Sequence, residues 1–312
     1  MRSFKLRVLC SLLGAALTLS LAACGTSPSG SAPTAQPDPF ASAGADPSPA
    51  QKTDAPESSA SVPPSAQPSP EPTPSPEPTP SPEPEYEPYV FGTPLEEGEA
   101  VEDSYFDDAV FLGDSRTEGL QLFGGLAHGD YYWARGMTVF QADDPKYAVF
   151  TVDGGQYTML GALARKRYKA VYIMIGVNEL GYPVSSYEEG LGKLVDRVLE
   201  LQPEAVVYLQ IMPPINDAMA RENGLADYIN NGNLAAFNEV VVRTAAEKRV
   251  VLLDTAAVYR DEDGQLLADV ASDGCHFTRG GYARWVDYLR CHVMDAQRYF
   301  YDRTLTEEAD ET

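Results

Sequence analysis

Short runs of apolar residues recur along the C-terminal two thirds of the chain, separated by polar or glycine-containing segments. Runs of this length are typical of buried strands, and the strands of a parallel sheet are apolar on both faces. We therefore predict strands at residues 109–112, 171–175, 206–209 and 250–253, and a less apolar strand at 131–134.

Amphipathic segments between and after these runs predict helices. Apolar residues recur every three or four positions from Tyr187 to Leu199 and again from Tyr282 to Val293, as on the buried stripe of a helix. Alternating strands and helices imply an α/β fold, a doubly wound parallel sheet of about five strands with right-handed crossovers. Ligands of such sheets bind beyond the carboxyl ends of the strands, so catalytic residues should directly follow strands.

The N-terminal third has a different pattern. Residues 1–23 combine a basic start with an uncharged apolar run that is short for a membrane span, as in a signal peptide. Residues 24–102 are rich in Pro, Ser, Thr, Ala and Glu, and Glu-Pro-Thr-Pro-Ser-Pro repeats from Glu71. Frequent proline predicts a disordered linker with an extended polyproline segment. We interpret it as a spacer, with a docking site for a proline-binding partner as the weaker alternative.

The composition becomes globular after this linker. We expect one domain at residues 103–302, followed by an acidic tail at 303–312. About 200 residues are enough for a single hydrophobic core, and no second linker interrupts them.

The sequence Leu21-Ala22-Ala23-Cys24 resembles the lipobox of bacterial lipoproteins. This resemblance implies that Cys24 is lipidated, palmitate being one such acyl group, and becomes the mature N-terminus. The protein would then be exported and lipid-anchored to the outer face of the cytoplasmic membrane, touching the membrane through its anchor only. An ordinary secretory signal is the alternative.

The charge of the chain excludes one class of partner. It has 23 Lys and Arg against 46 Asp and Glu, a formal net charge of −23. Because nucleic acids are polyanions that bind through basic surfaces, we expect no nucleic-acid partner.

The remaining cysteines and histidines do not predict a disulfide or a metal site. Cys275 precedes a predicted helix and Cys291 lies far along it, an arrangement that would hold their Cα atoms too far apart for a disulfide. His128 and His292 have no partner at metal-ligand spacing, and the acidic run at 261–264 lacks the terminal ligands of a calcium loop. We therefore expect no metal and no cofactor.

Three short motifs follow predicted strands or precede the last helix. They are Gly113-Asp114-Ser115, Gly176-Val177-Asn178 and Asp273-Gly274-Cys275-His276. Each has a structural explanation: Ser115 and Glu118 fit a capping box, Asn178 a helix cap and Asp273-Gly274 a turn. Together they supply a nucleophile, an oxyanion donor, a base and its orienting acid, the set that acyl transfer requires.

At these residues the chain resembles the SGNH hydrolases, also called GDSL esterases, which are flavodoxin-like α/β/α sandwiches. The resemblance implies that Ser115 is the nucleophile and that its backbone N–H is one oxyanion donor. It also implies that His276 is the base, Asp273 the acid that orients it, and Asn178 a side-chain oxyanion donor.

Three positions depart from the family pattern. Arg116 follows the serine where the family often has leucine, and Glu179 follows the asparagine where it often has aspartate. We expect both to be substrate contacts. Gly136 fits the position of the oxyanion glycine, although Ala134 stands where the family often has asparagine.

The resemblance implies hydrolysis of short-acyl esters. With the predicted export signal and the lack of metal-ligand spacing, we expect a metal-free serine esterase that acts outside the cell. The predicted anchor and spacer favour an envelope polysaccharide with O-acetyl groups, or an ester-bearing small molecule, as substrate. An O-acyltransferase of the same fold is the nearest alternative. A non-catalytic envelope-binding lipoprotein is the third, but a binding protein has no use for the complete catalytic set.

Overall fold

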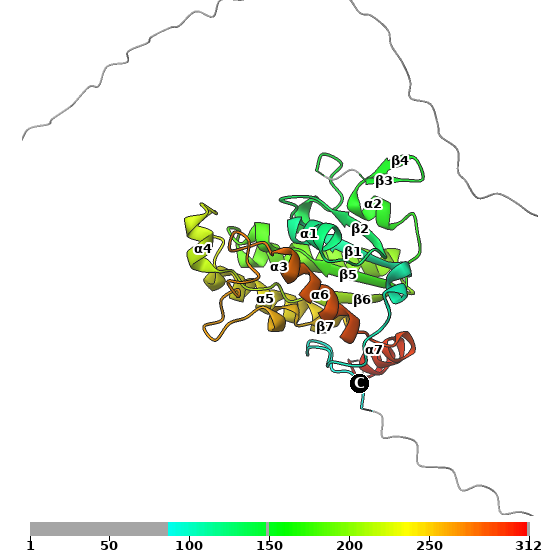
Figure 1. Cartoon of the computed structure of the whole chain (residues 1–312). Helices are drawn as coiled ribbons and strands as arrows, with labels where there is room; N and C mark the ends of the chain where they lie inside the picture. The colour runs from blue at the N-terminus through cyan, green and yellow to red at the C-terminus, as the bar shows by residue number, and fades with distance from the viewer. Residues whose placement is uncertain (1–86, 148–149, 311–312) are drawn as a thin grey trace, which may run out of the picture. The chain divides into compact units, whose positions relative to one another are not determined.

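The computed structural model describes residues 87–147 and 150–310 (Figure 1). The predicted signal peptide, Cys24 and the linker up to residue 86 lie outside the described residues. Within the described part, no helix is both long enough and apolar enough to cross a membrane.

A five-stranded parallel sheet in the order β2-β1-β5-β6-β7 forms the centre of the molecule. Its strands are β1 (Ala109–Gly113), β2 (Asp130–Trp133), β5 (Ala170–Met174), β6 (Val206–Gln210) and β7 (Val251–Leu253). Every residue of β1, β5, β6 and β7 is buried, as expected for strands covered on both faces. The doubly wound α/β sheet predicted from the sequence is confirmed.

Seven α-helices and four short 3-10 helices accompany the sheet in the described residues. The α-helices are α1 (Ser115–Phe123), α2 (Met159–Leu163), α3 (Val184–Leu201), α4 (Asp217–Glu222), α5 (Asn231–Glu247), α6 (Arg279–Cys291) and α7 (Ala296–Asp310). The 3-10 helices are η1 (Asp103–Asp108), η2 (Val139–Gln141), η3 (Val177–Glu179) and η4 (Thr255–Val258).

The helices cover both faces of the sheet (Figure 1). The chain winds from β1 to β2 in one direction and from β5 through β6 to β7 in the other. Because parallel crossovers are right-handed, this reversal places the connecting helices on opposite faces. Accordingly, α1 packs against α6 on one face, and α3 packs against α5 on the other.

A short hairpin was not predicted from the sequence. Strands β3 (Phe150–Val152) and β4 (Gly155–Tyr157) pair antiparallel outside the main sheet. Asp153 and Gly154 between them both have positive φ angles, 48° and 78°, as in the tight turns that join hairpin strands.

Stacked aromatic rings cross four neighbouring strands of the main sheet. The rings of this aromatic ladder belong to Tyr131, Phe111, Tyr172 and Tyr208, from β2, β1, β5 and β6. Their centroids are 4.7, 4.9 and 4.4 Å apart, and each ring belongs to a residue directly paired with the next. Such cross-strand pairs stabilise one register of the sheet over its alternatives.

Residues 87–102, which the sequence assigns to the linker, pack against the folded domain; we call them the N-terminal strap. The backbone N–H of Leu95 donates to the carbonyl of Leu252 in the edge strand β7. The N–H of Gly98 donates to the carbonyl of Cys291, one of the carbonyls that the end of α6 leaves unpaired. The folded part therefore begins before residue 103, and α7 continues it beyond 302, into the predicted tail.

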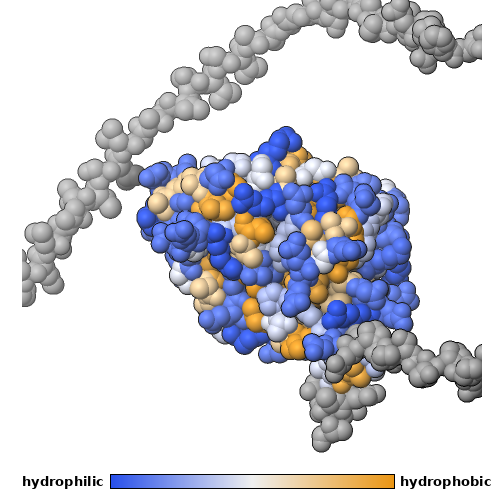
Figure 2. Space-filling model, turned by 60° about the horizontal axis from the view of Figure 1, so that its bottom comes forward, coloured by the Kyte–Doolittle hydropathy of each residue, from blue (hydrophilic) through white to orange (hydrophobic). Residues whose placement is uncertain are grey.

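The face drawn in Figure 2 has small groups of hydrophobic residues set among hydrophilic ones. Such scattered apolar residues are normal on a protein surface.

The N-terminal strap should contribute to stability through Tyr89. The side chain of Tyr89 is buried, its hydroxyl accepts the N–H of Leu252 at 3.1 Å, and its N–H donates to Asp302 at 3.0 Å. We expect Tyr89→Ala to lower the free energy of unfolding by about 3 kcal/mol, as for other large-to-small core substitutions. Thermal denaturation should show a melting temperature lower by roughly 6–12 °C.

The neighbouring Val90 provides the control, because its side chain is 65% exposed. Val90→Ala should change stability by less than about 0.5 kcal/mol. Equal melting temperatures for Tyr89→Ala and Val90→Ala would show that the strap lies on the domain without stabilising it.

Candidate active site

Ser115 begins α1, one residue after the end of strand β1. The helix is capped by Asp114, whose side chain accepts the backbone N–H of Arg116 at 2.9 Å. Glu118 does not reach back to form a capping box; its carboxylate binds Arg135 through two hydrogen bonds of 2.6 and 2.7 Å. The structure therefore gives the capping role to Asp114, and the Ser115 hydroxyl is available for another partner.

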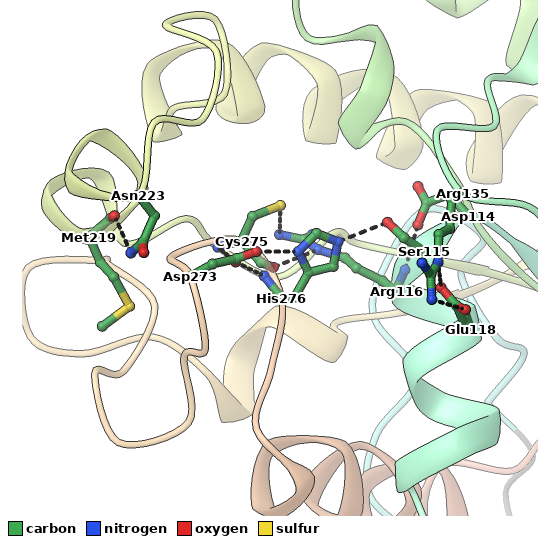
Figure 3. Close-up of polar contacts among 10 residues, drawn as sticks. All are labelled: Asp114, Ser115, Arg116, Glu118, Arg135, Met219, Asn223, Asp273, Cys275 and His276. Atoms are coloured by element: carbon green, nitrogen blue, oxygen red, sulfur yellow. Dashed lines mark hydrogen bonds and ion pairs between the residues drawn. The ribbon is translucent and has the colours of Figure 1, made fainter. Parts of the chain in front are cut away.

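That partner is His276 (Figure 3). Ser115 Oγ lies 2.9 Å from His276 Nε2, and His276 Nδ1 lies 2.7 Å from Asp273 Oδ2. The loop before α6 thus brings the predicted base and acid to the predicted nucleophile at the start of α1. In this geometry Nδ1 donates to the carboxylate, which leaves Nε2 free to accept the serine proton.

The carboxylate of Asp273 is held on both oxygens. Oδ1 accepts the backbone N–H groups of Cys275 at 2.8 Å and His276 at 2.7 Å. Partial burial acts to raise the pKa of Asp273, but the hydrogen bonds from the His276 ring and these two N–H groups outweigh it and hold the pKa well below its usual range. Asp273 is therefore ionised at neutral pH, as an orienting acid must be.

Gly274 is required in this loop by a close approach. Its φ is +96°, and a Cβ atom there would lie 2.4 Å from the backbone nitrogen of Ala220 in α4. The carbonyl of Gly274 also accepts the N–H of Asn216 at 2.8 Å. The loop that carries Asp273 and His276 is thus packed directly on the start of α4.

Arg116, which the sequence suggests as a substrate contact, is buried instead. Its Nε donates to the carbonyl of Cys275 and its Nη1 to the carbonyl of Pro213, both at 3.1 Å. Figure 3 shows the side chain running from α1 toward Cys275. Arg116 is only 1% exposed and does not line the cleft, so the prediction that it contacts the substrate is wrong. It ties the serine helix to the histidine loop.

Glu179, the other suggested substrate contact, is also fully buried. Its Oε1 accepts the backbone N–H of Val139 at 2.6 Å, while Oε2 has no hydrogen-bond partner within the described part of the chain. Burial raises its pKa to about 8, and the nearby Asp114 acts in the same direction. The side chain joins η3 to η2 and does not reach the cleft.

Asn178 lines the cleft next to the serine. Its Nδ2 donates to the carbonyl of Met137 at 2.9 Å and makes a longer contact of 3.4 Å with Asp114 Oδ2. One N–H is therefore firmly bound, and the other is only weakly engaged. Gly136 also lines the cleft, with a φ of +72° that favours glycine. The structure thus brings both predicted oxyanion donors to the same cavity as Ser115.

The cleft has a volume of about 640 Å³. Its lining residues are Ser115, Glu118, Gly119, Leu122, Phe123, Arg135, Gly136, Asn178, Ser272, His276, Phe277 and Tyr282. Another cavity of about 620 Å³ lies beside α5 and contains none of the predicted catalytic residues. The ion pair of Glu118 with Arg135 at the cleft was not foreseen, because their sequence separation gives no sign of contact.

Cys275 points away from Ser115 and has a different environment. Its thiol is buried, 3.6 Å from Arg116 Nη2, and burial raises its pKa. A buried protonated thiol is a poor nucleophile. Cys275 and Cys291 are both free thiols. No three His, Cys, Asp or Glu side chains meet as a metal site in residues 87–147 and 150–310.

Comparison with known proteins gives a family match. Residues 111–284, more than half of the chain, match the model of the GDSL-like lipase/acylhydrolase family. None of the curated proteins matches the chain.

The solved structures that match the chain are remote in sequence. A protein from Streptococcus pneumonia described as a platelet activating factor is 23% identical, with 58% of this chain and 81% of that chain covered and a TM-score of 0.46. A protein from Bacteroides fragilis described as an acylhydrolase is 16% identical, with coverages of 62% and 88% and a TM-score of 0.45. A GDSL-like lipase from Bacteroides thetaiotaomicron is 14% identical, with coverages of 61% and 86% and a TM-score of 0.43.

The raised pKa of Glu179 predicts a pH-dependent stability. Between its ordinary pKa of 4.5 and about 8, the folded protein keeps a proton that the unfolded chain loses. Stability should therefore fall as pH rises through this window, by up to about 1.4 kcal/mol per pH unit from this group. Glu179→Gln, which cannot ionise, should remove that part of the slope.

Urea denaturation of wild type and Glu179→Gln at pH 5 and pH 8 measures this effect. The variant should gain stability relative to wild type on going from pH 5 to pH 8. A constant difference between the two proteins would mean that Glu179 is already ionised in the folded state.

Proposed function

Because the chain belongs to the GDSL-like lipase/acylhydrolase family, and is therefore an esterase- or lipase-type hydrolase, we propose that it is a serine esterase that acts through Ser115, His276 and Asp273. The observation that carries the proposal is the continuous set of hydrogen bonds from Asp273 through His276 to Ser115 Oγ. A serine hydroxyl is a weak nucleophile until a neutral imidazole accepts its proton, and this geometry provides that imidazole.

The reaction begins when Ser115 Oγ attacks the carbonyl carbon of the ester and His276 Nε2 takes the serine proton. The tetrahedral intermediate then collapses, the bond to the alcohol oxygen breaks, and His276 gives its proton to the departing alcohol. Water attacks the resulting acyl-serine with His276 again as base, which releases the carboxylic acid and restores Ser115. Asp273 remains ionised throughout and stabilises the imidazolium.

The negative oxygen of each tetrahedral intermediate requires hydrogen-bond donors that are already in place. The backbone N–H of Ser115, the N–H of Gly136 and the weakly engaged N–H of Asn178 are the donors we assign to it. This assignment is supported by the cleft, which Ser115, Gly136 and Asn178 line together.

Several features of the sequence support an extracellular location, while a short acyl group is what the resemblance to the GDSL esterases implies. The basic and apolar start of the chain, followed by Leu-Ala-Ala-Cys and a proline-rich spacer, favours an exported protein anchored through lipidated Cys24. We therefore take O-acetyl groups of an envelope polysaccharide as the substrate. The ester-bearing glycan would reach the enzyme outside the membrane, where the spacer carries the domain.

Removal of the nucleophile or the base should abolish esterase activity without unfolding the protein. Ser115→Ala and His276→Ala should each lower kcat for p-nitrophenyl acetate by about 10³–10⁶, and the double variant by little more, because the residues act as a unit. Since Asp114 provides the helix cap, Ser115→Ala should leave the melting temperature nearly unchanged, whereas Asp114→Ala should cost about 0.5–2 kcal/mol.

Spectrophotometric rates and thermal denaturation of the same samples test both parts. Retention of full activity by Ser115→Ala would refute the esterase mechanism. A large drop in melting temperature in that variant would instead show that the Ser115 hydroxyl is structural.

Asn178 offers a separate test of the oxyanion site. Asn178→Ala removes one donor, so kcat should fall by about 10²–10³ while KM changes little. Steady-state kinetics with p-nitrophenyl acetate separates the two constants. A change confined to KM would assign Asn178 to substrate binding, and normal values of both constants would remove it from the mechanism.

A further inference from the structure

Three large aromatic side chains are exposed at the carboxyl edge of the sheet. Phe140 is 46% exposed, Tyr182 51% and Tyr228 43%. The ring centroids of Phe140 and Tyr182 are 5.7 Å apart. The ring of Tyr228 lies over Gly181, where a Cβ atom would come within 3.0 Å of it. The three rings thus lie on one surface, which we call the aromatic platform.

The backbone beneath each ring is held by hydrogen bonds. The N–H of Val139, next to Phe140, donates to the side chain of Glu179, and the N–H of Tyr182 donates to the backbone carbonyl of Glu179 at 2.7 Å. The carbonyl of Tyr228 accepts the side-chain N–H of Asn233 at 2.9 Å. A surface fixed in this way loses little conformational entropy when a ligand binds to it.

The aromatic platform lies near the catalytic cleft. Phe140 follows the cleft residue Gly136 by four positions, and Tyr182 follows the cleft residue Asn178 by four. Four residues span at most about 14 Å even when fully extended, and here both segments include part of a 3-10 helix, which shortens them. The Cα atoms of Phe140 and Tyr182 therefore lie within about 14 Å of those of the two predicted oxyanion donors.

We propose that the aromatic platform binds the sugar rings of a glycan whose ester group is held at Ser115, an inference that rests on the esterase function proposed above. A pyranose ring has an apolar face of C–H groups and an edge of hydroxyl groups. A half-exposed aromatic ring matches this ligand, because it covers the apolar face while the hydroxyl groups stay in water. Contiguous exposed apolar surface next to a cleft is a mark of ligand binding.

A long acyl chain fits the platform less well. Each methylene gains free energy only as it is removed from water, so an acyl chain is best bound in an enclosed slot. The platform instead exposes about half of each ring to solvent. Its three rings are uncharged, and the chain as a whole carries a net charge of −23, which disfavours a polyanionic ligand. The ligand expected here is a neutral glycan.

Three substrates distinguish these possibilities in the purified protein. They are p-nitrophenyl acetate, p-nitrophenyl octanoate and an O-acetylated tetrasaccharide of β-1,4-linked N-acetylglucosamine. Tyr182→Ala should raise KM for the tetrasaccharide about tenfold, as for loss of one aromatic binding residue, with kcat within about twofold of wild type. Its kinetics with the two p-nitrophenyl esters should be unchanged.

Two control variants test the role of the ring. Tyr182→Phe keeps the stacking surface and should restore most of the wild-type KM. Tyr301 lies on α7 and is 54% exposed, so Tyr301→Ala removes a similarly exposed tyrosine outside the platform and should leave all three substrates unaffected.

The outcomes separate the platform from the esterase function. An unchanged KM for the tetrasaccharide in Tyr182→Ala, or hydrolysis of p-nitrophenyl acetate without any release of acetate from the tetrasaccharide, would refute glycan binding while the esterase function stands. An equal rise in KM for the octanoate would show that the rings bind acyl chains, which also refutes it. If wild type hydrolyses none of the three esters, the proposed function fails, and the platform proposal fails with it.

Discussion

The aromatic ladder fixes the register of four parallel strands, and the geometry of the cleft follows from that register. A slip of one residue would move a ring to the other face of the sheet, so the stacked arrangement strongly favours one pairing. In this register Gly113 pairs with Met174, and their strands end together. The segments that continue them bring Asp114 and Asn178 within 3.4 Å of each other. The contact between the serine motif and the asparagine motif is thus a consequence of the core.

Buried polar side chains then connect the loops that leave this edge. Asp114 caps the serine helix and contacts Asn178, Glu179 holds the backbone of η2, and Arg116 holds the carbonyl of Cys275. Burying acids and a guanidinium costs solvation free energy, and an apolar core would avoid that cost. Their hydrogen bonds hold each loop that carries a proposed catalytic group, which is the support that a preorganised site requires.

Local sequence patterns were enough to predict the strands and to predict that Ser115, Asp273 and His276 meet at the carboxyl edge of the sheet. The apolar runs identify buried strands, and in a parallel sheet the residues that follow such strands meet at one edge. The roles of Arg116 and Glu179 were not predictable in this way, because charged residues are mostly exposed and their partners here are distant in sequence. Arg116 binds the carbonyl of Pro213, 97 residues away, and Glu179 binds the N–H of Val139, 40 residues away.

The N-terminal strap was not predicted for a related reason: several of its contacts are backbone hydrogen bonds, which composition does not encode, and Tyr89 contacts residues that are distant in sequence. It leads through η1 to the amino end of β1 and meets the last residues of α6. Helix α6 begins three residues after His276 and is 13 residues long, so about 20 Å of helix separates the strap from the histidine loop. The strap therefore runs beside the edge strand β7 and then past the amino edge of the sheet, while the cleft and the aromatic platform lie at the carboxyl edge. The glycan proposed above would therefore reach Ser115 without meeting the strap.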